Sequence, residues 1–352
     1  MNIKKLQAEL KENQAFLISS PENRRYLTGF ASSDGYLLIT RSEAVFFIDS
    51  RYIEAAQKSI TECTEIVLLK SLSAQLKEHV EKLGISTVFT ECERLSVAEF
   101  NKFCETAGCE CRAEKADDAV NALRRSKCGE EKAKILAAQS IAEKAFDHIL
   151  GFIKEGVTER EVALTLDFFM LRSGAECVSF ETIAVSGKNS SMPHGVPCDK
   201  KIEKGDFITM DFGAVVDGYH SDMTRTVAVG EVSSKQAEIY ETVLRAQESS
   251  LRILKAGVSC RDADAAARDI IEKAGYGEFF GHGTGHGVGI EIHEQPRLSP
   301  KSGQTLQVGD VVTVEPGIYL PDEFGVRIED MAIIAENGFE NLTKSPKNLI
   351  IL

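Results

Sequence analysis

Two aspartates lie in consecutive apolar runs, where a carboxylate needs a specific reason to be. Asp211 and Asp222 stand on either side of Asp217-Gly218, and an Asp-Gly pair between two β-rich runs indicates a hairpin turn. With that turn, Asp222 pairs opposite Gly213, and Asp211 points to the same face. The two carboxylates are then diagonal neighbours about 7–8 Å apart at the backbone. A cation between them would bring both into ligand range, whereas the alternative is a polar outer face of the hairpin.

Two glutamates further along the chain have a similar setting. Glu315 follows the β-branched run Val311–Val314, and Glu329 follows Val326–Ile328, with a turn expected at Pro321–Gly325. A glutamate after such a run is poorly explained by solvent exposure. Structural ion pairs also place charges in apolar surroundings, so a buried ion pair is the alternative interpretation for each residue taken singly.

Three of the seven histidines fall within residues 281–296, namely His282, His286 and His293. Glycines alternate through this segment and let the backbone approach a site closely. A phosphate-binding loop is the alternative, but the spacing is not G-x-G-x-x-G opening a helix, and the sequence that follows reads as extended up to Pro296. The segment is therefore expected to bring imidazoles to a site.

Four carboxylates that met at one site would repel one another. Unit charges about 4 Å apart cost about 1 kcal/mol even in water and several times more inside a protein. Two divalent cations would cancel four negative charges, and carboxylates with an imidazole favour Mn²⁺, Co²⁺ or Zn²⁺ over the metals that prefer thiolates. Two such ions generate a hydroxide nucleophile at neutral pH, which is the chemistry of two-metal hydrolases.

Several ordered motifs carry a resemblance to a known family. Residues 128–345 resemble the creatinase/aminopeptidase P/prolidase family of pita-bread metallopeptidases, and Arg25–Phe30 is similar to part of that family's smaller N-terminal domain. The matching blocks are Pro193-His194-Gly195; Gly205-Asp206 followed by Met210-Asp211-Phe212-Gly213; Gly218–Thr226; His282–Gly289 with His293-Glu294-Gln295-Pro296; Val314–Tyr319; and Gly325–Asp330.

The resemblance implies a dinuclear centre that holds two divalent metal ions, Mn²⁺ first and Co²⁺ or Zn²⁺ as alternatives. Its implied ligands are Asp211, Asp222, His286, Glu315 and Glu329. The resemblance also implies that His194 and His293 flank the scissile bond and stabilise the oxyanion. Glu315, which would contact the bridging water, is implied to act as the proton shuttle.

The substrate implied by the resemblance is a peptide that contains proline. His282 resembles a histidine that lines the pocket for the proline ring, and Arg327 and Tyr319 resemble groups that face the substrate or support the ligands. An Xaa-Pro bond is a tertiary amide without an N–H, so a shaped apolar pocket must hold the ring. The expected activity is that of an Xaa-Pro aminopeptidase, with an Xaa-Pro dipeptidase restricted to dipeptides as the alternative.

Two other classes stay open as alternatives. An amidinohydrolase of the creatinase type resembles this fold but does not keep the full ligand set, so the presence of all five ligands argues against it. A binding module without enzymatic activity is the other class, and it would lack bound divalent metal. His220 is expected to lie outside the ligand set, and Asp217 is expected to be a turn residue.

The elements that must position these residues indicate two domains. Residues 1–123 alternate strands (15–19, 36–40, 45–49, 66–70) with helices (50–59, 73–83, 96–104), which indicates an α/β domain like the creatinase N-terminal domain. Residues 124–352 combine helices (130–153, one capped by Thr158 with Glu161, 234–255, 261–274) with strands (208–216, 219–229, 288–293, 311–320, 326–334). This pattern predicts an α+β catalytic domain, which the resemblance identifies as the pita-bread type. His79 and His148 lie on polar helices and are expected to face solvent.

Composition narrows the function classes. The net charge of −13 argues against a nucleic-acid partner and against a membrane surface. The nine cysteines are irregularly spaced, which favours free thiols in a reducing compartment. The start of the chain lacks the apolar run of a signal peptide, and no apolar stretch reaches bilayer length. We therefore expect a cytoplasmic protein, and the resemblance implies a homodimer.

Overall fold

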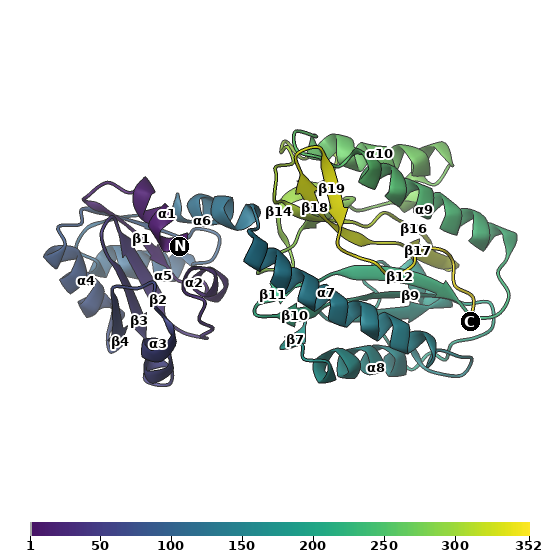
Figure 1. Ribbon diagram of the computed structural model, residues 1–352, viewed down its shortest axis with the longest axis horizontal. Coiled ribbons are helices and arrows are strands. Elements are labelled where there is room, and N and C mark those ends of the chain that lie inside the picture. The colour runs from purple at the N-terminus through teal and green to yellow at the C-terminus, as the bar shows by residue number, and fades with distance from the viewer. Residues whose placement is uncertain (1) are drawn as a thin grey trace. The chain divides into compact units, whose positions relative to one another are not determined.

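The computed structural model describes residues 2–352, and the chain divides into two compact units, one ending at Arg124 and the other beginning at Arg125 (Figure 1). All nine cysteines are free thiols. Within the described residues, no helix combines the length and apolarity that a membrane crossing requires.

The N-terminal unit is built on one mixed sheet with the strand order β4-β3-β2-β1-β5-β6. Strand β2 pairs antiparallel with β1 and β3, and the remaining neighbours run parallel. Its strands are β1 (Gln14–Ile18), β2 (Tyr36–Thr40), β3 (Ala44–Ile48), β4 (Glu65–Leu68), β5 (Thr87–Thr90) and β6 (Glu110–Arg112). Its helices are α1 (Asn2–Glu9), α2 (Pro21–Thr28), α3 (Ile53–Ser59), α4 (Leu72–Lys82), α5 (Val97–Thr106) and α6 (Ala116–Arg125).

One histidine expectation in this unit is wrong. His79 on α4 is buried, and its ring meets the ring of Phe47 edge-on at 5.0 Å between centroids. Its Nδ1 lies 2.8 Å from the carbonyl oxygen of Gln75, one turn earlier. The residues around His79 on α4 are polar, so the sequence predicted an exposed ring. The sequence does not show that this ring packs against Phe47 of the sheet. His148, by contrast, is exposed as expected and stacks on Phe169.

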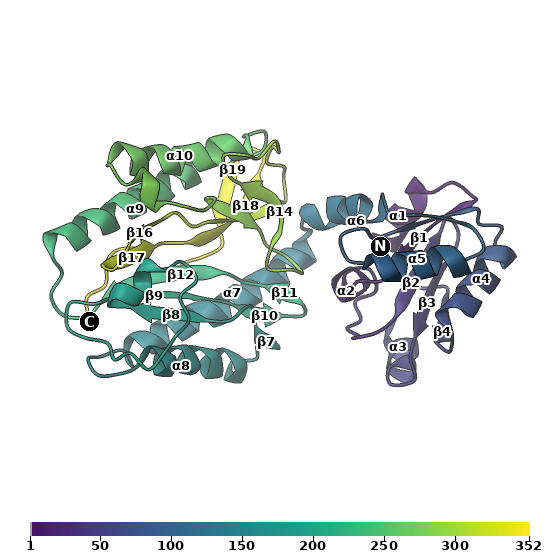
Figure 2. The same cartoon turned by 180° about the vertical axis from the view of Figure 1, so that it is seen from behind.

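The C-terminal unit places strands between two pairs of helices (Figures 1 and 2). Its helices are α7 (Gly129–Leu150), α8 (Glu159–Arg172), α9 (Ser234–Ile253) and α10 (Cys260–Lys273), with short 3₁₀ turns at η1 (Gly187–Ser191) and η2 (Gly277–Phe279). Helices α7 and α8 pack on β8, β9 and β12 around Phe146, Leu166 and Met210. Helices α9 and α10 pack on the β16–β17 hairpin around Val243, Ile318 and Val326.

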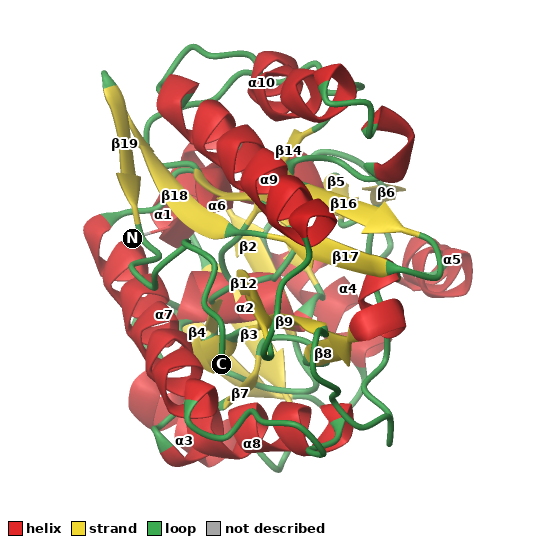
Figure 3. Cartoon of the chain, turned by 90° about the vertical axis from the view of Figure 1, so that its right-hand side faces the viewer, coloured by secondary structure: helices red, strands yellow, loops and turns green. Residues whose placement is uncertain are grey.

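The strands of this unit form several small antiparallel sheets, coloured yellow in Figure 3. The sheets run β12-β9-β8, β11-β10-β7, β14-β13-β15-β18-β19 and β16-β17. The first set of strands is β7 (Cys177–Val178), β8 (Ile183–Ser186), β9 (Phe207–Phe212), β10 (Ala214–Val216), β11 (Tyr219–His220) and β12 (Met223–Ala228). The second set is β13 (Gly285–Gly287), β14 (Glu294–Leu298), β15 (Val311–Val314), β16 (Gly317–Leu320), β17 (Phe324–Arg327), β18 (Asp330–Ala335) and β19 (Gly338–Asn341).

The expected helix starts are found where the sequence places capping residues. Thr158 accepts from the backbone N–H of Glu161, whose carboxylate accepts in return, so α8 begins with a capping box as predicted. Helix α10 ends at Lys273, and Gly275 beyond it has φ +86°, a left-handed conformation that glycine adopts without strain. These caps fix the directions in which the helices enter and leave the strand layer.

Four strands expected to be continuous are interrupted, and the carboxylates lie at or beside the interruptions. The pairs Phe212↔Met223 and Val215↔His220 place Asp222 opposite Gly213, which is the predicted register. A Cβ on Gly213 would lie 1.9 Å from the carbonyl oxygen of Ser221, so only glycine lets the two chains approach there. The second hairpin breaks in the same way, after β15 at Glu315-Pro316 and before β18 at Glu329.

The strand expected over residues 288–293 is wrong. Gly287 pairs with Glu294 because the register between β13 and β14 shifts after His286, so residues 288–293 form the connection between these strands. Val288 and Ile290 are buried although they lie in a loop. The apolar side chains of Val288 and Ile290 led to the strand prediction. They are apolar because they are buried, although the backbone there forms a loop.

Candidate metal centre

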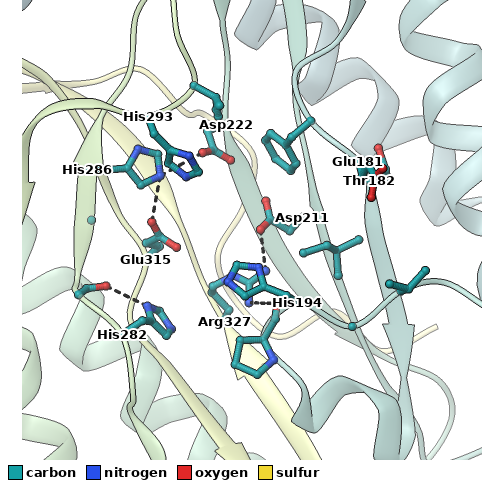
Figure 4. A pocket seen from close by; sticks show the side chains of 18 of the residues that line it. Glu181, Thr182, His194, Asp211, Asp222, His282, His286, His293, Glu315 and Arg327 are labelled. Atoms are coloured by element: carbon teal, nitrogen blue, oxygen red, sulfur yellow. Dashed lines mark hydrogen bonds and ion pairs between the residues drawn. The ribbon is translucent and has the colours of Figure 1, made fainter. Parts of the chain in front are cut away.

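A cavity of about 590 Å³ opens in the C-terminal unit where the two interrupted hairpins meet (Figure 4). Its wall includes carboxylates, imidazoles and apolar residues, which gives it polar chemistry on one side and apolar contact area on the other. The lining residues are Phe180, Glu181, Thr182, Ile183, Pro193, His194, Gly195, Val196, Pro197, Asp211, Asp222, His282, Gly283, Gly285, His286, Ile292, His293, Arg297, Ser299, Glu315 and Arg327.

His286 lies at the centre of the predicted ligand set. Its Nε2 lies 3.6 Å from Oδ2 of Asp222 and 3.3 Å from Oε1 of Glu315. Its Nδ1 lies 3.0 Å from the carbonyl oxygen of Gly287, an acceptor that requires Nδ1 to carry the proton. The lone pair of Nε2 therefore faces the two carboxylates, which is the orientation of a metal-binding imidazole.

Glu329 is a third predicted ligand that lies close to Asp222 and His286. One ligand atom each from Asp222, His286 and Glu329 lies within 4.8 Å of the others, and all three residues are buried. Thr224 donates its hydroxyl to Oε2 of Glu329 at 2.7 Å, whereas the buried Oε1 has no hydrogen-bond partner in the part of the chain that the structure describes. The same holds for the buried Oδ1 of Asp211. Unpartnered buried carboxylate oxygens are costly unless a cation binds them, so this donor set fits divalent metal.

The electrostatics of the protein alone point the same way. Burial first, and the neighbouring carboxylates second, raise the pKa of Asp222 and of Glu329 well above the usual carboxyl range. Burial raises the pKa of Glu315 to about 7 and lowers the pKa of His286 to about 3. The contacts of His286 with these carboxyls are therefore not ion pairs of the protein itself. A bound cation favours the charged carboxylates and the neutral imidazole together.

Arg327 connects the predicted ligands to the rest of the site. It is 3% exposed, and its Nη2 donates to Oδ2 of Asp211 at 2.6 Å, a contact that Figure 4 marks with a dashed line. Its Nε donates to the hydroxyl of Thr224 at 3.1 Å, and Thr224 in turn holds Glu329. Its Nη1 donates to the carbonyl oxygen of Pro193 at 3.2 Å. Protein acceptors thus occupy most of the guanidinium donors, which leaves little for a substrate.

Tyr319 was expected to face the substrate or to support the ligands, and it is not among the residues that line the cavity. Its hydroxyl lies 2.9 Å from Nε2 of His282 and accepts from Nη1 of Arg327 at 2.9 Å, so the ring is buried behind the histidine. His282 itself lines the cavity, and burial lowers its pKa to about 4, so it is a neutral ring near neutral pH. Tyr319 therefore orients His282 and does not face the cavity.

The two remaining predicted histidines lie at the rim. His293 meets the ring of His286 edge-on at 4.4 Å between centroids, and burial is the first cause that lowers its pKa. His194 is exposed and lines the cavity from the connection between β8 and β9. Figure 4 shows that these rings border the carboxylate group from different elements. Both are placed to contact a molecule bound beside the carboxylates.

Sequence reasoning missed Arg297 and the apolar lining residues of the cavity, which are Phe180, Ile183, Pro193, Val196 and Pro197. Arg297 lies on β14 and lines the cavity, and no described residue pairs with its guanidinium. A signal was present, because residues 293, 295 and 297 share one face if an extended strand follows His293. These apolar residues carried no spacing signal, since they come from two separate segments of the chain.

Comparisons with known proteins agree with this geometry. The profile of metallopeptidase family M24 matches residues 133–336, and that of the creatinase/prolidase N-terminal domain matches residues 2–126. An Xaa-Pro dipeptidase of Pyrococcus furiosus is 39% identical over 342 residues, covering 95% of this chain and 94% of that protein. The solved structure of an Xaa-Pro dipeptidase from Bacillus anthracis matches with a TM-score of 0.96 at 44% identity, covering 100% and 99% of the two chains. That of an X-Pro aminopeptidase from Thermotoga maritima matches with a TM-score of 0.91 at 38% identity, covering 99% and 100%.

Proposed function

Because the chain belongs to metallopeptidase family M24, we propose that it is an Xaa-Pro dipeptidase that hydrolyses dipeptides with proline at the second position. The sequence ranked Xaa-Pro aminopeptidase first and the dipeptidase second. The relatives named Xaa-Pro dipeptidase in Pyrococcus furiosus and Bacillus anthracis favour the opposite order. A feature of the cavity supports that order independently.

That feature is the guanidinium of Arg297, with which no residue of the described range 2–352 pairs. A free dipeptide carries a carboxylate on its proline, only a few bonds from the scissile amide, whereas a longer peptide carries another amide there. An arginine without an acidic partner on the same cavity wall as His286 and His293 suits such a carboxylate, which it can bind bidentately. Arg297 is the observation that carries the choice of dipeptides over longer peptides.

We propose that the protein binds two divalent cations and that Mn²⁺ is the preferred metal. The residues that would hold them are Asp211, Asp222, His286, Glu315 and Glu329. Bound there, such cations lower the pKa of a water molecule and polarise the scissile carbonyl. The oxygens of Asp211 and Glu329 that lack partners are the observation on which this fit rests.

The residues of the chain would divide the remaining work. His194 and His293 donate hydrogen bonds from ring nitrogens to the carbonyl oxygen as it gains negative charge. Glu315 takes the proton of the attacking water at Oε1 or Oε2 and passes it to the departing proline nitrogen. His282, which is hydrogen-bonded to Tyr319, would pack beside the proline ring of the substrate. The ring of Phe280 meets the His282 ring edge-on at 5.0 Å between centroids.

The experiment that tests the substrate compares three compounds: an Xaa-Pro dipeptide, its C-terminal amide and an Xaa-Pro-Yaa tripeptide. We expect the wild-type protein with Mn²⁺ to cleave the dipeptide and to act poorly on the other two. Arg297→Met should raise KM for the dipeptide about 10- to 100-fold, the loss of a charged hydrogen bond, and leave the amide unchanged. Arg297→Lys is the matched control that keeps the charge and recovers part of the affinity.

The second candidate is an Xaa-Pro aminopeptidase, which the match to the Thermotoga maritima X-Pro aminopeptidase supports. Tripeptide cleavage at least as efficient as dipeptide cleavage, with no effect of Arg297→Met on either, would favour this candidate. We also propose that the chain acts as a homodimer. Light scattering coupled to size exclusion tests this, and a mass equal to one chain at micromolar concentration would contradict it.

A further inference from the structure

The connection between β8 and β9 carries His194 at the rim of the cavity. We define the His194 loop as residues 187–197, from the residue after Ser186 to the residue before Cys198. Met192 is 50% exposed and Val196 is 75% exposed, so the loop does not gain its conformation by burying these apolar side chains. Its position must therefore be set by contacts at its ends and by its backbone.

One buried carboxylate accepts hydrogen bonds from the two residues that flank this loop, Ser186 and Cys198. Glu159, the first residue of α8, is 1% exposed. Its Oε1 accepts from the backbone N–H of Ser186 at 2.7 Å and from the Ser186 hydroxyl at 2.9 Å. Its Oε2 accepts from the backbone N–H of Cys198 at 3.3 Å and from the Cys198 thiol at 3.2 Å. Asn189, inside the loop, donates its Nδ2 to both oxygens at 3.1 Å.

The first turn of α8, which contains Glu159, is hydrogen-bonded to the segment that follows the His194 loop. The backbone N–H of Arg160 donates to the carbonyl oxygen of Cys198 at 3.0 Å, and that of Glu159 donates to Lys200 at 3.1 Å. These are N–H groups that a helix cannot satisfy internally. No described cation forms an ion pair with Glu159, so the helix N-terminus and the loop donors together stabilise its charge.

The middle of the loop is held from the opposite side by the hairpin of the metal centre. Ser190 accepts from the backbone N–H of Gly325 at 2.9 Å, and Arg327 donates to the carbonyl oxygen of Pro193, next to His194. Arg327 fixes one point of the loop, whereas Glu159 fixes both of its ends. His194 lies between these anchors and has no hydrogen-bond partner of its own among residues 2–352.

We propose that Glu159 is a positioning residue that closes the His194 loop and so sets His194 against the substrate carbonyl. This inference rests on the proposed function, because it assumes that His194 contacts the substrate. Glutamine in place of Glu159 has the same shape but only one acceptor oxygen, and its NH₂ group would face donors of the loop. At least one end of the loop would then lose its anchor.

The test is a double-mutant cycle between Glu159→Gln and His194→Ala, assayed on an Xaa-Pro dipeptide with Mn²⁺. We expect Glu159→Gln to lower kcat about 10- to 100-fold, the effect of a small misplacement of a catalytic group, with KM changed less than about threefold. In the His194→Ala background the same substitution should cost less than about threefold. Glu161→Gln is the matched control, because Glu161 lies on the same helix turn and is exposed, and it should retain activity within about twofold.

Losses that multiply in the double variant would overturn the proposal, because Glu159 would then act independently of His194. Hydrogen exchange gives a second readout that does not depend on turnover. Amides 187–197 should exchange faster in Glu159→Gln than in wild type, while those of α9 and α10 stay unchanged. Unchanged exchange in the loop, or faster exchange throughout the unit, would also overturn it. A wild-type protein that leaves Xaa-Pro dipeptides intact would contradict the proposed function alone, since the exchange result still decides the role of Glu159.

Discussion

Arg327 donates to Oδ2 of Asp211 at 2.6 Å, so a buried guanidinium holds one of the proposed metal ligands in place. The same guanidinium reaches Thr224, which donates to Glu329, and Pro193, which precedes His194. A single side chain from β17 therefore supports two carboxylates and the backbone of the His194 loop. This arrangement makes Arg327 a support of the centre, and its exposure of 3% argues against direct capture of substrate.

Replacing Arg327 should therefore weaken metal binding. In Arg327→Lys the ammonium can reach one acceptor at a time, because it lacks the planar fork that serves Asp211, Thr224 and Pro193 together. We expect Mn²⁺ affinity to fall about 10- to 100-fold, the usual cost of losing a group that orients a ligand. Calorimetric titration of metal-depleted protein measures this. Arg268→Lys is the control, because Arg268 pairs with Asp264 on α10 outside the ligand set, and unchanged affinity in Arg327→Lys would contradict the role.

Metal binding should release protons because it stabilises the charged carboxylates, and in the metal-free protein the contribution of Glu315 to stability should fall as pH rises. Burial raises the pKa of Glu315 from 4.5 to about 7, so this group binds more protons in the folded metal-free state than in the unfolded state over this interval. Burial lowers the pKa of His286 to about 3 and of His282 to about 4, and these rings act in the opposite direction below pH 6.5. The contribution of Glu315 is therefore measured as the difference in the free energy of unfolding between wild type and Glu315→Gln, and it should fall as pH rises from 4.5 towards 7. Urea unfolding of both metal-free proteins at several pH values checks this, and a difference that grew over the interval would contradict it.

The N-terminal unit should show the opposite pH dependence at one buried carboxylate. Burial alone would raise the pKa of Glu91, but hydrogen bonds from Ser20, Asn23 and Ser19 outweigh it, and the pKa is lowered. Oε2 accepts from the backbone N–H of Ser19 at 2.6 Å and of Ser20 at 2.8 Å. The stability from these bonds is present above pH 4.5 and is lost as pH falls through the lowered pKa.

Glu91→Ala should thus destabilise the N-terminal unit at pH 7, because several buried donors lose their acceptor. Each unsatisfied group costs about 1–3 kcal/mol, so we expect a loss on the order of several kcal/mol. Denaturant unfolding followed by hydrogen exchange in β1 and α2 measures the effect. Glu93→Ala, at a more exposed position two residues along, is the control. Equal stability of the two variants would show that the Glu91 bonds contribute little.

Gly213→Ala should disrupt the first hairpin and with it the metal centre. The added Cβ would lie 1.9 Å from the carbonyl oxygen of Ser221, and backbone atoms must move to relieve that clash. The movement would separate Asp211 from Asp222, so we expect both lower thermal stability and loss of bound Mn²⁺. Gly338→Ala is the control, because nothing lies within 4 Å of a Cβ there. Full metal content in Gly213→Ala would show that the hairpin tolerates the change.

The fold class and the enzyme class were predictable because both rest on local patterns. The α+β pita-bread domain and the creatinase-like N-terminal domain expected from the motifs are confirmed by the matches to both families. The Asp217-Gly218 turn determined a register by simple counting, and the structure has that register. Capping at Thr158 was equally readable, since it depends on residues three apart.

Other features were hidden because they depend on contacts between distant segments. The strand breaks at Glu315-Pro316 and before Glu329 lie inside apolar runs that read as continuous, and the loop at 288–293 is apolar because it is buried. Whether Tyr319 faces the substrate or supports other site residues stayed open, because its partners His282 and Arg327 come from separate elements. The role proposed for Glu159 required knowing that Ser186 and Cys198 meet at the start of α8.

Acidic side chains from two hairpins and one imidazole are placed to hold divalent metal for peptide hydrolysis. The most direct test is the turnover of an Xaa-Pro dipeptide by metal-depleted wild-type protein and by Asp222→Ala after each is reconstituted with Mn²⁺. We expect the wild-type protein to recover activity with Mn²⁺ and Asp222→Ala to stay below about one hundredth of that activity. Turnover by Asp222→Ala close to that of the wild type, or wild-type turnover that needs no metal, would show that hydrolysis does not depend on metal at this centre.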